Sequence, residues 1–312
     1  MNKRIAIPVL VAFAAGCAET VSYEPPAPTA DAGISAPEAS VPERCPANVG
    51  ALRVARAEDQ GPTAPFRPEL PLTAEEEAFN TARAPAEQLV AWESSEVRLP
   101  GGASWVFYGR YLVRPGYLNF QGLGASVARR NAPGARPTRE PGALLFPTEP
   151  QFTSAAVLHE GFVHAYACRI DGFLDAACRL GRVPEARVAD RGAWTFWDGG
   201  AWSEDILRAR DVNRGMHGFS LTWNRHLGRW LALSGQILGD TASFRTAERL
   251  EGPWSAPVRA FTGLPAGDGH SDYNFALVPD ASDPEGCTVA VRYDHPTSPT
   301  SAETRLVRVT LE

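Results

Sequence analysis

The chain has 312 residues, 44% of them hydrophobic, and it contains 28 glycines and 27 prolines. This length allows one large domain or two small ones, and the glycine and proline content, with no long helical pattern, favours short strands joined by turns. The formal net charge is −6 and no basic run is present, so we expect no nucleic-acid partner.

The first 17 residues have the composition of an export signal. MNKR supplies a positive start, IAIPVLVAFAA an apolar core that is too short to span a bilayer, and small residues precede Cys17. The ending AAGC resembles the lipobox of bacterial lipoproteins, which implies that Cys17 is lipidated and anchors the protein, its membrane contact being this anchor only. Ala18 then implies outer-membrane sorting. Ala14 stands where that motif usually has leucine, and a plain signal peptide with an incidental Cys17 is the alternative.

Residues 18–44 are rich in proline, alanine, serine, threonine and acids, with almost nothing to bury. This composition predicts a disordered tether between the anchor and a folded domain at 45–312.

Without Cys17, four cysteines remain, an even number that suits disulfides in an exported protein. Cys168 and Cys178 flank residues 171–173 at nearly equal distances, so they should face each other across a hairpin. By elimination, Cys45 pairs with Cys287. No cluster of cysteine and histidine predicts a metal site.

Four segments share one layout of an alternating strand, a turn and a second alternating strand. They span residues 92–112, 152–170, 218–237 and 272–295. A third alternating strand follows each, and a fourth is plausible in three of them. Such repetition every ~54–67 residues predicts an all-β fold, a β-propeller with radially arranged blades. A β-sandwich is the alternative.

The last unit ends after its third strand and needs a donor. Residues 50–56 (GALRVAR) are the candidate, and a Cys45–Cys287 bridge would pin that N-terminal strand to the blade it closes. Residues 57–90 are ambiguous, because TAEEEAFNTARA (73–84) fits a short helix with Thr73 as N-cap, or the segment hides part of a further blade. Four blades are visible, and five are expected.

In the third unit, Trp223 and Trp230 alternate with polar positions, and we expect both to pack between blades. Asn224 and His226 lie at the turn, where solvent or turn backbone should bond them.

The stretch LTWNRHLGRWLAL, followed by FRTAERLEGPWSAPV, resembles a bacterial family of uncharacterised function. The ending RYDHPTSPTSAETRLVRVTL is similar to that family's last blade. The resemblance covers roughly residues 92–312. It implies a five-bladed propeller akin to glycoside hydrolase families 43, 62 and 68, and says little about activity.

The innermost strands of a propeller line a central funnel. Aligning them places Ser94, Ser154, Ser220 and Asn274 in one polar column, which either lines a watered channel or bonds blade to blade. Candidate ligand-binding residues at the funnel entrance are Trp92, His217, His270, Tyr273 and Asn274. Glu93 and Asp272 could converge there as the two carboxyls that glycoside hydrolysis requires.

The related enzymes use three acids from separate blades, whereas the second and third inner strands here contain none. We therefore expect a monomeric envelope protein whose funnel binds a glycan or a similar polar ligand without catalysis. A glycoside hydrolase with paired carboxylates is the alternative. No cofactor is predicted; a Ca²⁺ ion in the central channel is conceivable, but no motif supports it.

Overall fold

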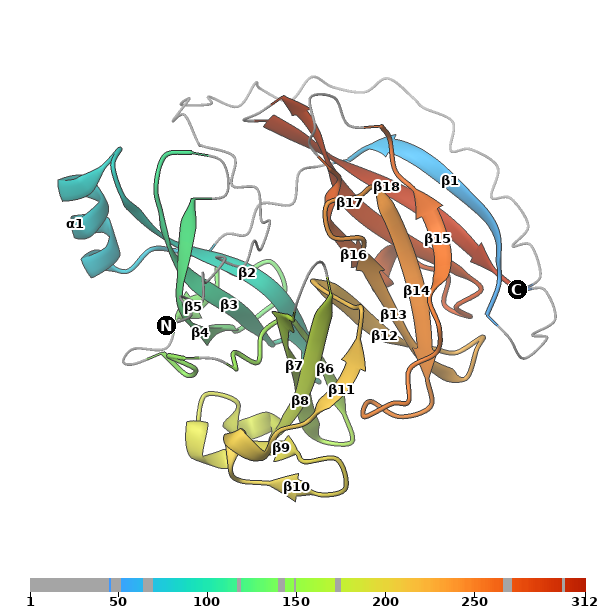
Figure 1. Ribbon diagram of the computed structural model, residues 1–312, viewed down its shortest axis with the longest axis horizontal. Helices are drawn as coiled ribbons and strands as arrows, with labels where there is room; N and C mark the ends of the chain where they lie inside the picture. The colour runs from blue at the N-terminus through green and yellow to red at the C-terminus, as the bar shows by residue number, and fades with distance from the viewer. Residues whose placement is uncertain are drawn as a thin grey trace, which may run out of the picture.

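The computed structural model describes residues 45, 52–63, 70–116, 119–139, 144–148, 150–171, 175–265, 271–298 and 301–312. The predicted leader and tether, with Cys17, lie outside these residues, as does His270. Four antiparallel sheets follow one another around a centre (Figure 1). Their innermost strands are neighbours in chain order: β2 (Gln88–Arg98), β6 (Ala155–His159), β12 (Phe219–Asn224) and β16 (Tyr273–Leu277). The predicted β-propeller is confirmed.

Blades 1 and 3 are plain four-stranded meanders. Blade 1 consists of β2, β3 (Ser104–Val113), β4 (Phe120–Arg130) and β5 (Thr138–Arg139). Blade 3 consists of β12, β13 (Arg229–Gly235), β14 (Thr241–Ala247) and β15 (Val258–Thr262). The alternating hairpins expected from the sequence form in both blades.

Blade 2 is larger because short elements extend it outward. It comprises β6, β7 (Phe162–Ile170), β8 (Ala176–Pro184), β9 (Thr195–Trp197) and β10 (Trp202–Ser203), with β11 (Asp211–Arg214) also pairing with β8. Three 3₁₀ turns lie between these strands: η1 (Glu185–Arg187), η2 (Arg191–Ala193) and η3 (Ile206–Arg208). The predicted Cys168–Cys178 disulfide, here called the hairpin bridge, joins residues that face each other on β7 and β8.

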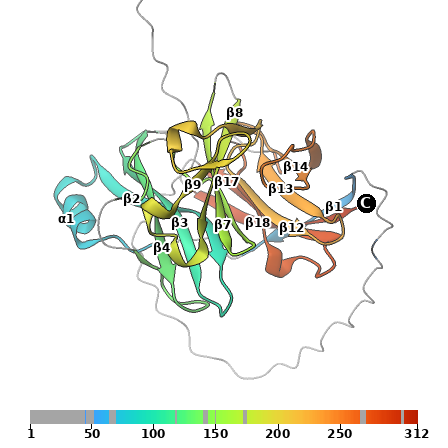
Figure 2. The same ribbon diagram turned by 90° about the horizontal axis from the view of Figure 1, so that it is seen from below.

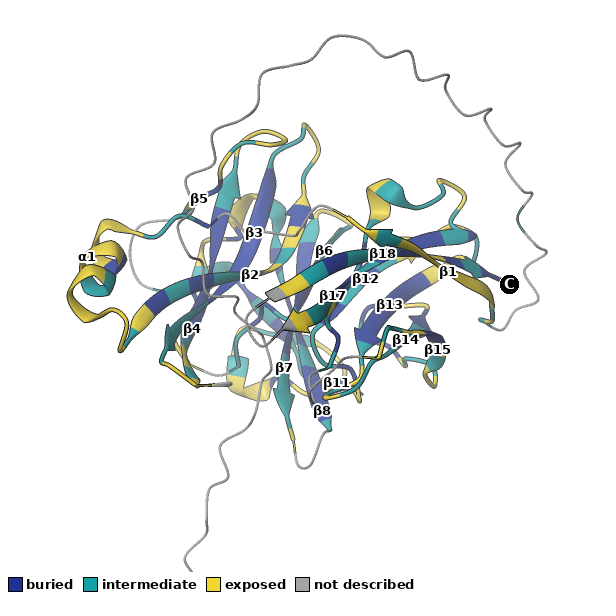
Figure 3. Ribbon diagram, turned by 90° about the horizontal axis from the view of Figure 1, so that it is seen from above, coloured by how far each residue is buried: buried dark blue, intermediate teal, exposed yellow. Residues whose placement is uncertain are grey.

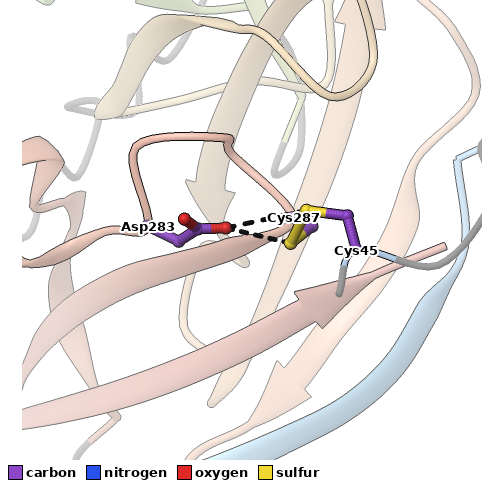
Figure 4. Close-up of side chains that lie close together, drawn as sticks. All are labelled: Cys45, Asp283 and Cys287. Carbon is purple, nitrogen blue, oxygen red and sulfur yellow. Dashed lines mark hydrogen bonds between the residues drawn. A yellow bond between two sulfur atoms is a disulfide. The ribbon is translucent and has the colours of Figure 1, made fainter. Parts of the chain in front are cut away.

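Blade 4 is closed by the N-terminal strand, as predicted. Its order is β1-β18-β17-β16, built from β16, β17 (Thr288–Ser298), β18 (Ser301–Leu311) and β1 (Val54–Pro62), with the 3₁₀ turn η4 (Pro279–Ala281) between β16 and β17. The donor strand thus begins near the end of the expected segment 50–56. The Cys45–Cys287 disulfide, here called the closing bridge, fixes the chain just before β1 to the start of β17 (Figure 4).

The described residues form no fifth sheet, and a helix occupies part of the ambiguous segment 57–90. This helix, α1 (Ala74–Arg83), has the predicted cap, because Thr73 accepts from the amide of Glu76 while the Glu76 carboxylate accepts from the amide of Thr73. Figures 1 and 2 both place α1 on the outer side of blade 1, across the molecule from β1.

Glu76 fixes α1 to the face of blade 1 that looks away from blade 2. Its side chain is 1% exposed and pairs with Arg139 on β5 and, at 2.9 Å, with Arg110 on β3. Burial raises the pKa of Glu76, but the bonds from Arg139 and Thr73 and the two positive charges lower it overall. Leu70 covers the apolar part of the same face. A further blade would pack on this face, and the described residues between β1 and β2 cover it instead of forming that blade.

Apolar clusters lie between consecutive blades, and Figure 3 shows the buried residues along the strands of the blades. Trp230 is 3% exposed and its ring meets His159 of blade 2 at 5.1 Å between centroids, so its packing between blades is confirmed. Trp223 differs from the prediction. It is 46% exposed, although it is the cross-strand partner of Trp230 and its ring lies 5.5 Å from that of Trp230 between centroids. Within the described residues, no helix is long and apolar enough to cross a membrane.

The turn of the third hairpin is bonded to its own backbone and to blade 4. Asn224 accepts from the amide of Leu227 at 2.9 Å and donates to the carbonyl of Gly286 at 2.8 Å. The side chain is buried, so it joins two blades on the side opposite the funnel.

Candidate functional site

The polar column of the inner strands serves mainly to bond backbone. Ser220 accepts from the amide of Leu277 in blade 4 at 2.7 Å. Ser95 accepts from the amide of Ala156 in blade 2 at 3.0 Å. Ser154 accepts from Cys168 within its own blade. The alternative in which the column bonds blade to blade is therefore correct for Ser220, and Ser95, next to the predicted Ser94, makes the corresponding bond between blades 1 and 2.

Ser94 does not occupy the position that the sequence alignment assigned to it. A register shift between Glu93 and Ser95 leaves Ser94 unpaired in the ladder, and its hydroxyl donates to the carbonyl of Phe107 at 3.1 Å. This bulge gives the blade-facing position to Ser95, and places Glu93 opposite Tyr108 on the face that looks toward blade 4.

Glu93 is a predicted site residue with a strongly raised pKa. Burial raises the pKa of its carboxyl to about 7, and the nearby charge of Glu96 adds to this, whereas Arg130 and Arg292 oppose it. A carboxyl with this pKa exists in both protonation states at neutral pH. It can therefore donate or accept a hydrogen bond there.

Arg292 reaches the same place from β17 of blade 4. Burial lowers the pKa of its guanidinium, while Asp294 and Glu93 favour its charge. Asp294 follows two residues later on β17, so it shares the face of that strand. The charges of Arg292 in the last blade and Glu93 in the first blade are thus close enough to influence each other's pKa.

Asp294 is held by two short hydrogen bonds. Asn274 donates to it at 2.8 Å and Thr304 at 2.6 Å. Asn274 has φ of +55°, a left-handed conformation uncommon outside glycine and frequent at functional sites. Burial raises the pKa of the Tyr273 phenol to about 12, and the nearby charge of Asp294 adds to this increase. We call Glu93, Arg292, Asp294 and Asn274 the funnel cluster.

Asp272, the other predicted catalytic acid, lies in a different environment. Its side chain is fully buried, and its Oδ1 lies 2.8 Å from Nδ1 of His295. Its amide donates to Asp240 of blade 3 at 3.0 Å. Burial raises the pKa of Asp272 to about 6, against the bond from His295. Asp272 is not among the charges that shift the pKa of Glu93.

The remaining predicted ligand-binding residues lie at varied places. Trp92 forms an aromatic group with Tyr111 and Phe120, with ring centroids 4.5 and 5.3 Å away, where β2 and β4 begin and β3 ends. His217 precedes β12, and burial lowers the pKa of its imidazole. The structure thus brings Glu93, Tyr273 and Asn274 into one neighbourhood.

Sequence reasoning missed Arg292 and Asp294 because only inner strands were aligned. The signal was present in TVAVRYDH, where two charged residues alternate with aromatic and apolar ones on a second strand. Second strands of a blade are ordinarily apolar on both faces. A charge there indicates a face that meets water or a ligand.

One group of potential metal ligands occurs among the described residues: Cys45, Asp283 and Cys287 (Figure 4). Oδ2 of Asp283 lies 2.9 Å from Sγ of Cys287. Both sulfurs belong to the closing bridge, so neither is a thiolate that could bind a cation. The group is a disulfide with a neighbouring carboxylate.

A family model described as Domain of unknown function (DUF4185) matches residues 126–306, more than half of the chain. The chain belongs to this DUF4185 family. The match begins within β4 and ends within β18, so it includes blades 2 and 3 whole. No curated protein matches the sequence. The family of unknown function expected from the sequence is confirmed.

Solved structures resemble this DUF4185 protein in fold. A presumptive hydrolase from Bacteroides ovatus has a TM-score of 0.52 at 10% identity, over 71% of this chain and 61% of that one. A family 117 glycoside hydrolase from Zobellia galactanivorans has a TM-score of 0.41 at 10% identity, over 72% and 60%. The GH43_1 enzyme from Xanthomonas citri complexed with xylose has 0.41 at 11%, over 75% and 92%. The chain spans about three fifths of the first two proteins.

Proposed function

We propose that the funnel cluster binds a carbohydrate or a similarly hydroxylated ligand without cleaving it. Sugar hydroxyls donate and accept hydrogen bonds at once, and the cluster offers both kinds of partner. Arg292 and Asn274 are donors, Asp294 is an acceptor, and Glu93 with a pKa of about 7 can be either.

The observation that carries this proposal is the separation of the two predicted catalytic acids into different environments. Hydrolysis needs two carboxyls that flank one glycosidic bond, roughly 5–10 Å apart. Asp272 is fully buried beside His295, with its amide bonded to Asp240 of blade 3, whereas Glu93 lies opposite Tyr108 in blade 1. Among the described residues of β6 and β12, no acid replaces it.

Hydrolysis remains the second candidate because of one observation, the raised pKa of Glu93. A general acid that protonates a leaving oxygen needs a pKa near the working pH, and Glu93 has one of about 7. The likeness in fold to glycoside hydrolases is consistent with either candidate.

A glycan-array screen combined with product analysis distinguishes the two. Wild type should bind one class of glycan and release no shorter products. Glu93→Gln should weaken this binding, because the amide cannot supply the carboxylate that faces Arg292. Asp272→Asn should leave it nearly unchanged. Glu248→Gln is the matched control. The Glu248 side chain, directly after β14, is 76% exposed, and its ion pair among the described residues is with Arg229. Products that disappear in Glu93→Gln would favour hydrolysis, and absence of glycan binding would overturn both.

We also propose that the protein is a monomeric lipoprotein, attached to the outer membrane of the bacterial envelope through Cys17. The two disulfides support an oxidising, exported location. Metabolic labelling with a palmitate analogue should mark the wild type and not Cys17→Ser. Persistent labelling of that variant would refute lipidation at Cys17. Light scattering of the purified protein should give the monomer mass.

A further inference from the structure

A groove lies between the end of blade 1 and the 3₁₀ turns of blade 2, away from the funnel cluster. Its volume is about 500 Å³, within the range of small-molecule sites. Blade 1 contributes the segment 144–148 after β5, and η2 and η3 contribute the opposite wall. The lining is largely apolar, with Leu145, Phe146 and Ile206 as main components. Leu207 stands at the rim and is 79% exposed.

Among the residues that the structure describes, Arg191 is the one charged residue that lines this groove. Its guanidinium carbon lies 5.1 Å from the ring centre of Phe146 and 5.1 Å from that of Phe196. Its side chain makes no hydrogen bond or ion pair with any residue that the structure describes. Burial lowers the pKa of the Arg191 guanidinium, and no other cause contributes to the shift. No described carboxylate offsets that burial.

Two other arginines in the same stretch of chain do have acidic partners. Arg187 pairs with Asp190 at 2.5 Å, and Arg208 pairs with Asp198 at 3.0 Å. Asp190 adjoins Arg191, yet its carboxylate also accepts from the amide of Gly192. The acid nearest in sequence is thus already engaged by other donors.

A desolvated cation without a counter-charge is costly, and an anion that enters the groove would offset the cost. We propose that this groove binds an organic carboxylate with an aliphatic tail, its carboxylate paired with Arg191 and its tail along Leu145 and Ile206. The planar guanidinium, held between two rings, suits two-pronged pairing with a carboxylate. Leu207, exposed in the empty groove, becomes covered by the tail.

A purely structural Arg191 would behave differently. If its stacking between Phe146 and Phe196 served only stability, Arg191→Met would lower the melting temperature. If the charge is kept for a ligand, methionine retains the length and the apolar contacts and removes an unpaired cation, so the melting temperature should stay or rise.

Calorimetric titration of the full chain with octanoate, octanol and octylammonium tests the proposal. Octanoate should bind about tenfold or more tightly than octanol, since a hydrogen-bonded charge pair contributes that much, and octylammonium should not bind. Arg191→Met should abolish the preference for octanoate over octanol. Arg187→Gln, which alters a paired arginine four residues earlier, should leave it intact.

Several results would overturn the proposal. These are equal binding of octanoate and octanol to wild type, no octanoate binding at millimolar concentration, and octanoate binding that survives Arg191→Met. A lower melting temperature of Arg191→Met with unaltered octanoate affinity would assign Arg191 a structural role instead.

Discussion

Replacing Glu93 by glutamine should stabilise the protein at alkaline pH and leave its stability near pH 4.5 unchanged. The folded state holds the pKa of Glu93 at about 7, against an ordinary value of 4.5. Between these values the folded state binds more proton than the unfolded state, so wild-type stability falls as pH rises from 4.5 to 7. The full difference corresponds to about 3 kcal/mol. Partial exposure of Glu93 reduces the expected gain above pH 7 to about 2 kcal/mol.

The assay is urea unfolding followed by tryptophan fluorescence at several pH values between 4 and 8.5. Glu248→Gln is the matched control, because Glu248 is exposed and is not among the charges that shift the pKa of Glu93. That variant should keep the wild-type dependence of stability on pH. Identical pH profiles for wild type and Glu93→Gln would refute the argument that Glu93 is desolvated at the funnel.

Three further predictions concern stability, each measured by urea unfolding under non-reducing conditions. Replacing both cysteines of a bridge by alanine should lower the free energy of unfolding by about 3 kcal/mol more for the closing bridge than for the hairpin bridge. The reason is that the two bridges close loops of 242 and 10 residues, while each has one buried cysteine. Equal losses for the two bridges would contradict this. Glu76→Gln should cost about 3 kcal/mol by leaving two guanidinium groups without a counter-charge, whereas the exposed Glu77→Gln should cost little; similar losses would count against the buried ion pair. Ser220→Ala should cost about 1–2 kcal/mol, since an amide of blade 4 loses its acceptor; no loss would show that water replaces the hydroxyl.

Alternation and turn residues were sufficient to predict the blades. The hairpin of β12 and β13 is a clear case, since its pairing runs without a shift from Phe219 opposite Ser234 to Asn224 opposite Arg229. Both disulfides also followed from position, because one pair flanks a turn and the other joins the ends of the folded region. These features depend on residues that are close in sequence or on the number and position of the cysteines, and both can be read from one sequence.

The candidate site depends on structural details that one amino-acid sequence does not reveal. The bulge after Glu93 exchanges the roles of Ser94 and Ser95, and nothing in WESSEV marks it. The helix α1 was foreseen as one of two alternatives, but its effect on blade number arises from Glu76 meeting Arg139, 63 residues away. Long-range ion pairs of this kind leave no periodic signal.

The route by which the chain closes has a consequence for its synthesis. Strand β1 is among the first described segments to be made, and its only ladder partner is β18, which holds the final residues of the described chain. Until β18 exists, β1 has no edge to join, and the closing bridge would hold it beside an unfinished sheet. Ribosomal stalling or proteolytic trimming before residue 301 would therefore leave two unpaired strand edges. Closure thus distinguishes intact copies from truncated ones, and quality-control proteases would find the truncated ones by their open edges.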